Sequence, residues 1–302
     1  MTFEVLILGC GAATPTSRHN PSSQLVNIHD KLFLVDCGEG TQMELRRNKV
    51  KFQKIQHIFI SHLHGDHYLG LLGLISSMHL LGRKSTLHLY GPAELKELVE
   101  LNLRVSQTYL DYPLVYHITD EKRQIKLFED KSLEVHSFPL KHRIPCTGFL
   151  FMEKQKQHKI HKDIIVEYRL SPSQIIQLKK GENVETNRGI LTVEQACILA
   201  DKPKSYAYCS DTMYWERLVD FISGVDLIYH ESTFLNSEKE RAKQTYHSTA
   251  EQAAKMAALL GAKKLILGHY SSRYTDLQPF IEQAKPFFEN VILADEGMVV
   301  AL

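Results

Sequence analysis

A six-residue string, HLHGDH, brings four side chains that can bind a metal into one short segment: His62, His64, Asp66 and His67. Imidazole nitrogens and carboxylate oxygens are ligands that suit Zn²⁺, and Gly65 permits a tight approach of the backbone. The string follows a short β-branched run and precedes an apolar stretch, so it lies at the end of an expected strand. A chance cluster on a solvated loop is the competing explanation, but this concentration of ligands after a strand favours a metal centre.

One short segment cannot complete the coordination of two metal ions, and further candidate ligands follow other expected strands. His142 comes after the run Val135–Leu140, Asp211 after the run SYAYCS, and His269 after the run KLILG. Each of these residues alone is more often structural or exposed than a ligand. Together with the string they make five histidines and two aspartates at the ends of short apolar runs, which predicts that they share one site.

The elements that must position these residues alternate between short strands and helices. The sequence predicts strands over Phe3–Leu8, Ser23–Ile28, Lys31–Val35, Ile55–Ile60, Thr86–Tyr90, Ser205–Ser210, Leu227–His230, Lys264–Gly268 and Val291–Ala294, and helices over Tyr68–Leu81, Ala93–Leu103 and Ser248–Leu260. The chain thus consists of two halves, each with strands first and helices after. This order favours two sheets packed face to face with helices on the outside.

Composition places the chain among ordinary globular proteins. Its 302 residues carry a formal charge of +1, so no overall basic field would attract a polyanion, and such a partner must be held locally. The longest apolar run, Tyr68–Gly82, is shorter than the roughly 20 residues of a membrane span. Five cysteines without a CxxC pair argue against a disulfide framework and against a thiolate zinc site. We therefore expect a cytoplasmic protein without a membrane segment.

The order of the candidate ligands resembles the metallo-β-lactamase superfamily, in which the signature H-x-H-x-D-H is followed by a distant His, a distant Asp and a distant His. The resemblance implies an α/β fold, a four-layer αβ/βα sandwich, with two Zn²⁺ ions per subunit. It also implies how the ligands divide: one zinc is held by His62, His64 and His142, the other by Asp66, His67 and His269, and Asp211 bridges the two.

Further motifs resemble the ribonuclease Z family, whose members process the 3′ ends of tRNA precursors. They are the opening ILGCGAATPT, VDCGEGTQ at 35–42, SDT at 210–212, HEST at 230–233, HST at 247–249 and HYSSRY at 269–274. These motifs extend over nearly the whole chain. The resemblance implies an endoribonuclease that removes the 3′ trailer, leaving a 3′-hydroxyl on the tRNA and a 5′-phosphate on the trailer.

Such a cleavage benefits from an acid beside the leaving 3′-oxygen, because an alkoxide of this kind is strongly basic. The resemblance implies that His247 is the general acid, that Glu231 orients it, and that Asp66 steers the attacking water. A structural explanation of the HST segment is helix capping, in which Ser248 caps the helix and Glu251 completes a capping box. The two explanations are compatible.

Residues 152–189 interrupt the alternation of strands and helices and are expected to be an insertion. The segment carries eight basic against five acidic side chains, and a stretch without any acid holds four lysines, Lys154, Lys156, Lys159 and Lys162. Such a segment can contact phosphates without reading bases. A solvated loop is the alternative, but the position between metal ligands resembles the protruding arm with which the family holds tRNA. Precursor tRNA is therefore the implied partner.

Three more features concern the substrate and the assembly. Arg273, in the SSRY segment, is a candidate for contact with a phosphate, with a simple surface charge as the equal alternative. The family is typically a homodimer in which the arm of one subunit serves the other, so the resemblance implies a homodimer. The chain departs from the family pattern where the arm has Pro172 between two serines instead of a Gly-Pro motif, and where residues 15–20 are PTSRHN instead of P-x-K-x-R-N.

Two other functions are compatible with the same ligands. A small-molecule hydrolase of this fold, such as a cyclic-nucleotide phosphodiesterase or an arylsulfatase relative, would share all seven ligands but has no need of the basic segment or of the HEST and HST motifs. An RNA-binding protein with a vestigial site is disfavoured because every ligand position is filled.

Overall fold

The structure is a computed structural model that describes residues 2–302, and the chain divides into two compact units. The larger unit takes in the chain up to Phe128, then Val135–Phe151 and Ser205–Leu302. The smaller unit consists of Glu129–Glu134 and Met152–Lys204.

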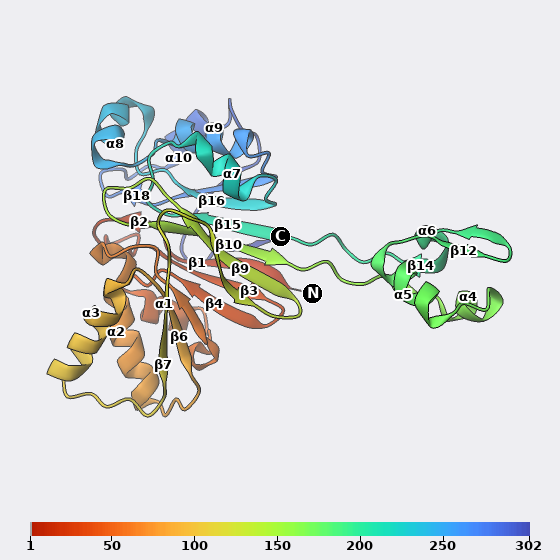
Figure 1. The fold of residues 1–302 in the computed structure, drawn as a ribbon. Helices are drawn as coiled ribbons and strands as arrows, with labels where there is room; N and C mark the ends of the chain where they lie inside the picture. The colour runs from red at the N-terminus through yellow and green to blue at the C-terminus, as the bar shows by residue number, and fades with distance from the viewer. Residues whose placement is uncertain (1) are drawn as a thin grey trace. The chain divides into compact units, whose positions relative to one another are not determined.

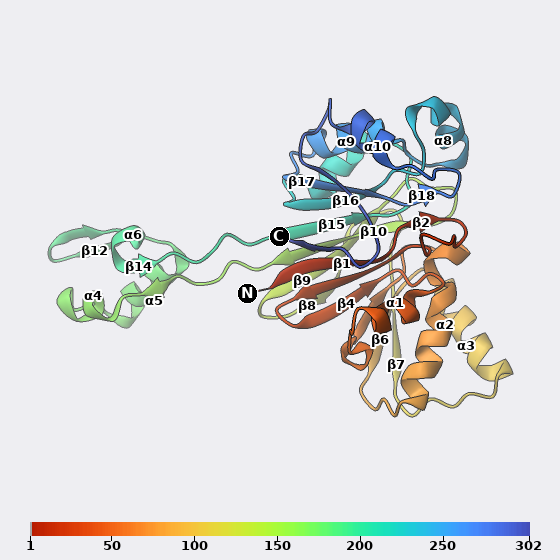
Figure 2. The same ribbon diagram turned by 180° about the vertical axis from the view of Figure 1, so that it is seen from behind.

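Two sheets of seven strands each, counted over residues 2–302, carry the fold (Figures 1 and 2). The first has the order β20 (Val299–Ala301), β1 (Phe3–Gly9), β3 (Ser23–Ile28), β4 (Lys31–Val35), β5 (His57–Phe59), β6 (Leu87–Gly91) and β7 (Leu114–Ile118). The second has the order β19 (Val291–Leu293), β17 (Lys264–Gly268), β16 (Leu227–Glu231), β15 (Ser205–Cys209), β10 (Thr147–Glu153), β9 (Leu133–Pro139) and β8 (Ile125–Glu129). Strands β4 to β7 are parallel, and so are β15, β16, β17 and β19.

Helices lie on the outer faces of both sheets (Figure 1). The first sheet carries α1 (Thr41–Arg47), α2 (Gly65–Leu80) and α3 (Glu94–Val105), and the second carries α7 (Val219–Ile222), α8 (Lys239–Thr245), α9 (Ala250–Leu259) and α10 (Gln278–Ala284). Between the sheets, the ring centroids of Phe33 and Phe151 lie 5.6 Å apart, and those of Phe59 and Phe149 lie 5.2 Å apart. The predicted sandwich of two sheets with helices outside is confirmed.

Most predicted elements are found, with shifts of a few residues at their ends. The strands over Ser23–Ile28, Lys31–Val35 and Lys264–Gly268 are confirmed at both ends. The helix predicted over Tyr68–Leu81 begins earlier, at Gly65, so Asp66 and His67 lie in its first turn and not on a loop. A carboxylate is favourable there because the first turn carries the positive end of the helix dipole.

The smaller unit has its own core and its own short elements. Its core side chains are Leu170, Leu178, Val184, Leu191, Val193, Ala196 and Cys197. Its elements are β11 (Lys159–Ile160), α4 (Lys162–Glu167), α5 (Pro172–Lys180), β12 (Val184–Thr186), β13 (Gly189–Leu191), α6 (Val193–Ala196) and β14 (Cys197–Ile198). Helix α5 begins with a capping box between Ser171 and Gln174. The insertion expected over residues 152–189 lies within this unit, which continues to Lys204.

Three short 3₁₀ helices in the described chain (Phe52–Lys54, Glu216–Leu218 and Asn236–Glu238) and the strand pair β2 (Gly11–Ala12) and β18 (Tyr270–Ser271) complete the fold. A search of the described residues finds no helix with the length and apolar character that crossing a membrane demands.

The first turns of α2 pack closely against the loop that follows β4. The amide of Cys37 donates to the carbonyl of His67 at 2.8 Å, and the amide of Gly70 donates to the carbonyl of Cys37 at 2.9 Å. A Cβ atom at Gly70 would lie 2.2 Å from the carbonyl oxygen of Gly38, so only glycine permits this approach. The contact sets the position of the helix start that carries two candidate ligands.

We expect Gly70→Ala to lower the free energy of unfolding by roughly 1–3 kcal/mol, because the added methyl group must push backbone apart. Gly73→Ala in the same helix is the matched control. There the nearest atom to an added Cβ is Gln42 Oε1 at 4.0 Å, so alanine should be neutral or stabilise by roughly 0.5–1 kcal/mol. Urea denaturation measures both variants, and equal effects would contradict the packing argument.

Candidate active site

The seven candidate ligands meet at one edge of the larger unit because they follow strands that end there. His62 and His64 lie between β5 and α2, and His64 is the residue that precedes the first turn of that helix. Asp211 follows β15, and His269 follows β17. Parallel strands place their carboxyl ends at the same edge of a sheet, so residues far apart in sequence become neighbours.

One group of ligand atoms comes from three histidines and one carboxylate. His64 Nδ1 lies 3.0 Å from His62 Nε2 and 3.1 Å from His142 Nε2. Oδ2 of Asp211 lies 3.5 Å from His62 Nε2 and 3.7 Å from His142 Nε2. All four ligand atoms lie within 4.8 Å of one another, as a shared metal ion requires.

A second group lies on the other side of Asp211. Oδ2 of Asp66 is 3.5 Å from His67 Nε2 and 3.4 Å from His269 Nε2. The other carboxylate oxygen of Asp211, Oδ1, is 3.3 Å from His67 Nε2 and 3.1 Å from His269 Nε2. Asp211 therefore presents one oxygen to each group. The structure brings together all seven residues that the sequence nominated as ligands.

Three of the side-chain atoms that face this centre lack hydrogen-bond partners in the described chain, and they are of the kinds that bind a metal ion. His67 Nε2, His269 Nε2 and Asp211 Oδ1 are buried and have no hydrogen-bond partner within residues 2–302. A buried polar atom without a partner is costly, and here three such atoms converge. Nitrogen and carboxylate oxygen donors in sets of three or four are the ligands that Zn²⁺ takes.

The charges of the centre also favour a cation. Burial opposes protonation of His67, yet the carboxylates of Asp211, Asp66 and Asp36 hold its pKa well above the ordinary value. Burial opposes ionisation of Asp66, yet the charge of His67 and the close approach of the His269 and His67 imidazoles to its carboxylate lower its pKa below the usual range. The carboxylates thus favour positive charge at this place, which a bound metal supplies.

Asp36, which the sequence analysis touched only as part of VDCGEGTQ, fixes the orientation of His67. Its fully buried carboxylate accepts hydrogen bonds at 2.7 Å from His67 Nδ1, at 2.7 Å from Tyr208 Oη, and at 2.7 and 2.9 Å from the amide and hydroxyl of Ser61. His67 is thereby left with Nε2 toward the ligand group. An aspartate directly after a strand was the signal that could have identified this residue.

His247 and Glu231 form a hydrogen-bonded pair beside the candidate metal ligands. Nδ1 of His247 donates to Oε1 of Glu231 at 2.8 Å, and its Nε2 lies 4.0 Å from Oδ2 of Asp211. The buried carboxylate of Glu231 also accepts from the amide of Thr212 and from the amide and hydroxyl of Thr233. Burial opposes protonation of His247, but the charges of Glu231 and Asp211 raise its pKa to about 9. The two carboxylates therefore favour the protonated form of the imidazole.

The capping box predicted with Ser248 and Glu251 is wrong by one residue. Thr249 caps α9, and Gln252 completes the box. Ser248 instead donates its hydroxyl hydrogen to the carbonyl of Thr212 at 2.7 Å, which ties the segment after His247 to the loop that carries Asp211. The Ser-Thr sequence offers two possible caps, and this tertiary hydrogen bond takes the first of them.

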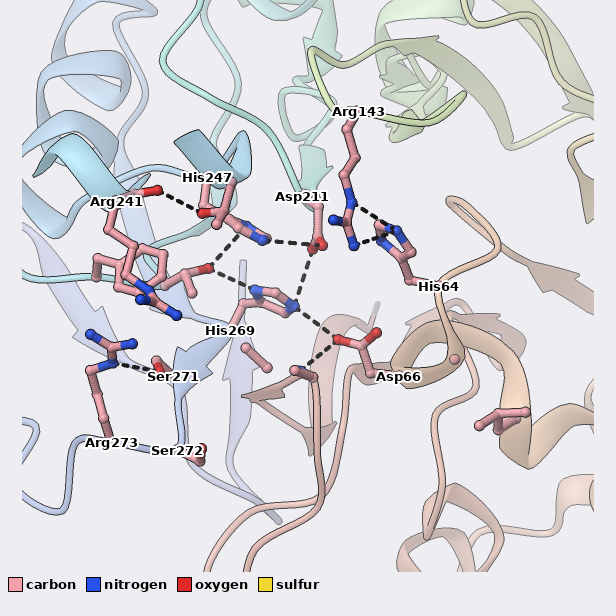
Figure 3. A pocket seen from close by; sticks show the side chains of 17 residues that line it. His64, Asp66, Arg143, Asp211, Arg241, His247, His269, Ser271, Ser272 and Arg273 are labelled. Carbon is pink, nitrogen blue, oxygen red and sulfur yellow. Dashed lines mark hydrogen bonds and ion pairs between the residues drawn. The ribbon is translucent and has the colours of Figure 1, made fainter. Parts of the chain in front are cut away.

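A pocket of about 400 Å³ opens beside the ligands (Figure 3). Three arginines line it: Arg143, Arg241 and Arg273. Arg273 pairs with Glu238 at 2.9 Å, and its guanidinium carbon lies 5.1 Å from the ring centroid of Phe234. Arg143 approaches Nε2 of His64 at 3.2 Å. The sequence analysis identified Arg273 but not the other two, because no motif surrounds them.

The four lysines of the basic stretch lie in the smaller unit and differ in their partners. Lys154 forms an ion pair with Glu129, and Lys156 pairs with Glu153 at 3.6 Å. Lys159 and Lys162 are exposed, and within the described residues neither has an ion-pair partner. Two of the four charges are therefore already matched inside the chain.

The chain resembles known proteins in sequence and in fold. A family model described as Anti-Pycsar protein Apyc1 matches residues 3–289. Ribonuclease Z of Bacteroides fragilis (strain YCH46) is 45% identical over 301 residues, which cover 99% of each chain. The crystal structure of human tRNase Z, short form, matches with a TM-score of 0.72 and 27% identity over 98% of each chain. The metallo-β-lactamase fold protein YhfI from Bacillus subtilis matches with a TM-score of 0.71 and 19% identity over the full length of both chains, which shows a shared fold.

We expect His64→Ala to weaken metal binding in one ligand group and Asp211→Ala to weaken it in both, because Asp211 faces both. Each variant should lose more metal affinity than the roughly 10- to 100-fold that results from removing a residue that only hydrogen-bonds a metal ligand. Metal content by mass spectrometry, together with hydrolysis of bis(p-nitrophenyl) phosphate, measures the effect. His161→Ala in the smaller unit is the control, and full metal content in Asp211→Ala would refute a shared centre.

Proposed function

The chain belongs to the ribonuclease Z family, and to the sequence family that the Apyc1 model describes, and we propose on this premise that it removes the 3′ trailer from tRNA precursors. It is a metal-dependent endoribonuclease of the metallo-β-lactamase fold. The observation that supports the proposal best is the His247–Glu231 pair at 2.8 Å beside the seven clustered ligands. A phosphodiester with a poor leaving group needs such an acid.

We propose that the centre holds two Zn²⁺ ions in each subunit. His62, His64 and His142 would hold one ion, Asp66, His67 and His269 the other, and Asp211 would contact both through its two oxygens. Two zinc ions bound there would supply electrophilic activation of the phosphate and would acidify an attacking water. The predominance of imidazole favours zinc over magnesium.

Asp66 and His247 act at opposite ends of the bond that breaks. Asp66 is held by a hydrogen bond of 2.7 Å from the amide of Ala13 to Oδ2, and it orients the water for attack on phosphorus. The bond from phosphorus to the 3′-oxygen breaks, and His247 gives its proton to that oxygen. The products are a tRNA with a 3′-hydroxyl and a trailer with a 5′-phosphate. Glu231 keeps Nε2 of His247 directed to the pocket.

The smaller unit is proposed to be the tRNA-binding arm, with residues 152–189 as its basic part. Exposed Lys159 and Lys162 are free to contact phosphates, and Lys154 and Lys156 can add to the positive charge only if they exchange their carboxylate partners. Arg273 is proposed to contact a phosphate in the pocket that it lines beside the candidate ligands.

We also propose a homodimer in a cytoplasmic setting. Apolar side chains on α2 and α3 are exposed, among them Leu69 (53%), Leu80 (81%) and Val105 (68%), and such a surface suits a second copy. The five cysteines are free and buried, as is usual in a reducing compartment.

The small-molecule hydrolase is the less favoured function. It would share the metal ligands, but the curated relatives at 43–45% identity over the whole chain carry the name Ribonuclease Z. Precursor tRNA incubated with the purified protein decides between the two, with one precursor that encodes CCA and one that does not. Absence of trailer removal, with rapid hydrolysis of a cyclic nucleotide, would overturn the proposal.

Within that assay, we expect His247→Ala to retain metal and to lose roughly 10²- to 10⁴-fold in kcat. A nitrophenyl phosphodiester should be cleaved with a smaller loss, because its leaving group needs no proton.

The pH profile gives a second measure: kcat falls as pH rises through the pKa of His247, since only the protonated imidazole donates. Glu231→Gln removes a charge that raises this pKa, so the fall should move to lower pH. An unmoved profile would exclude His247 as the acid.

For the arm, we expect Lys159→Ala with Lys162→Ala to raise KM for precursor tRNA more than it changes kcat, because a phosphate contact that takes no part in bond breaking binds ground state and transition state alike. The slope of log K against log salt should fall by roughly 0.7–0.9 for each phosphate that the variant no longer neutralises. Lys154→Ala with Lys156→Ala should have a smaller effect, since both lysines are paired. Replacement of all four by arginine keeps the charge and serves as control. Identical salt slopes in all variants would show that these lysines do not contact the RNA and that the segment is simply solvated.

A further inference from the structure

We propose that Arg241 binds the last phosphate of the mature tRNA, on the side of the leaving 3′-oxygen, and so selects where the cut is made. The inference rests on the proposed function and on His247 as the acid. It concerns a residue for which neither the sequence motifs nor the metal geometry gave a role.

Arg241 differs from the other two arginines of the pocket in its partners. Arg273 is paired with Glu238, and Arg143 is turned toward His64. The guanidinium of Arg241 is exposed, lines the pocket, and has no hydrogen bond or ion pair to any side chain or backbone atom of residues 2–302. An arginine without a carboxylate can bind a phosphate oxygen with two N–H groups at no cost from a broken ion pair.

The helix that carries Arg241 determines which way its side chain lies. Arg241 and Thr245 are four residues apart on α8 and therefore share one face, and both line the pocket. The hydroxyl of Thr245 donates to the carbonyl of Arg241 at 2.8 Å. Lys243, on the same helix, is exposed but does not line the pocket. The helix thus presents one of these two cations to the site and the other to solvent.

The position of Arg241 beside His247 indicates which part of the RNA it contacts. His247 follows α8 after one residue, Tyr246, and its amide donates to the carbonyl of Ala242 at 2.8 Å. Figure 3 shows Arg241 and Arg273 on the side of the pocket where His247 lies, with His64 and Arg143 on the other side. His247 protonates the 3′-oxygen, which belongs to the tRNA and not to the trailer. The phosphate one nucleotide before that oxygen is therefore the group that Arg241 reaches.

Binding measured with the metal chelated tests this contact without any cleavage. The variants are Arg241→Ala, Arg241→Lys and the matched control Lys243→Ala. The probes are precursor tRNA, the mature tRNA that ends at the cleavage position, and the same tRNA shortened by one nucleotide, which lacks the phosphate in question.

We expect Arg241→Ala to weaken binding of the precursor and of the mature tRNA by a similar factor, roughly tenfold for one charged hydrogen-bonded contact. The salt slope should fall by roughly 0.7. On the shortened tRNA the wild type and Arg241→Ala should bind alike. Arg241→Lys should recover part of the loss, because lysine keeps the charge but not the two-pronged geometry. Lys243→Ala should change each affinity by less than about twofold.

Three results would overturn the inference. A loss on the precursor without a loss on the mature tRNA would put the contact on the trailer. A loss that persists on the shortened tRNA, or that Lys243→Ala reproduces, would show only general surface charge. Equal affinities of wild type and Arg241→Ala would show no contact at all. The failure of the proposed function is a separate result, namely wild-type protein that does not remove a trailer.

Discussion

The candidate metal site depends on the hydrogen bonds that the buried carboxylate of Asp36 accepts. This carboxylate lies at the end of a strand in the first sheet and accepts a hydrogen bond from Tyr208, which belongs to the second sheet. It also holds His67 and Ser61. A buried charge is tolerated only when its oxygens are satisfied, so the two sheets can close over Asp36 only with these donors in place. One carboxylate thereby links the two sheets and fixes the orientation of a candidate ligand.

The backbone at the site is held in conformations that side chains rarely adopt. Asp36, Tyr246 and His269 have φ angles of 54°, 60° and 61°, in the left-handed region. Each such residue costs on the order of 1–3 kcal/mol and persists only where its surroundings enforce it. Here the parallel strands, the hydrogen bonds to Asp36 and the tie from Ser248 to Thr212 enforce it. The strained turns allow β17 and α8 to end and still direct His269 and His247 to a common pocket.

The sequence could predict the fold class and the candidate ligands because both depend on local patterns. Short apolar runs specify strands, and a metal-competent side chain just after a strand lies at the sheet edge. The start of α2 at Gly65 and the cap at Thr249 were not predictable, because the choice between adjacent residues depends on tertiary contacts, such as that of Ser248 with Thr212. The position of Asp36 directly after a strand could mark it as a candidate, but its hydrogen-bond partners were not predictable, because they are 25 to 172 residues away.

Whether a cationic side chain of this protein can bind a phosphate depends on whether it already has a carboxylate partner, and the net charge does not show this. A net charge of +1 hides cations of two kinds. Arg273, Lys154 and Lys156 have carboxylate partners, and a phosphate can take such a cation only by displacing an acid, so most of the attraction is offset. Arg241, Lys159 and Lys162 carry no such partner among residues 2–302. On the proposed function, an almost neutral protein can thus offer unpaired cations to a polyanion at two places, one beside His247 and one on the smaller unit.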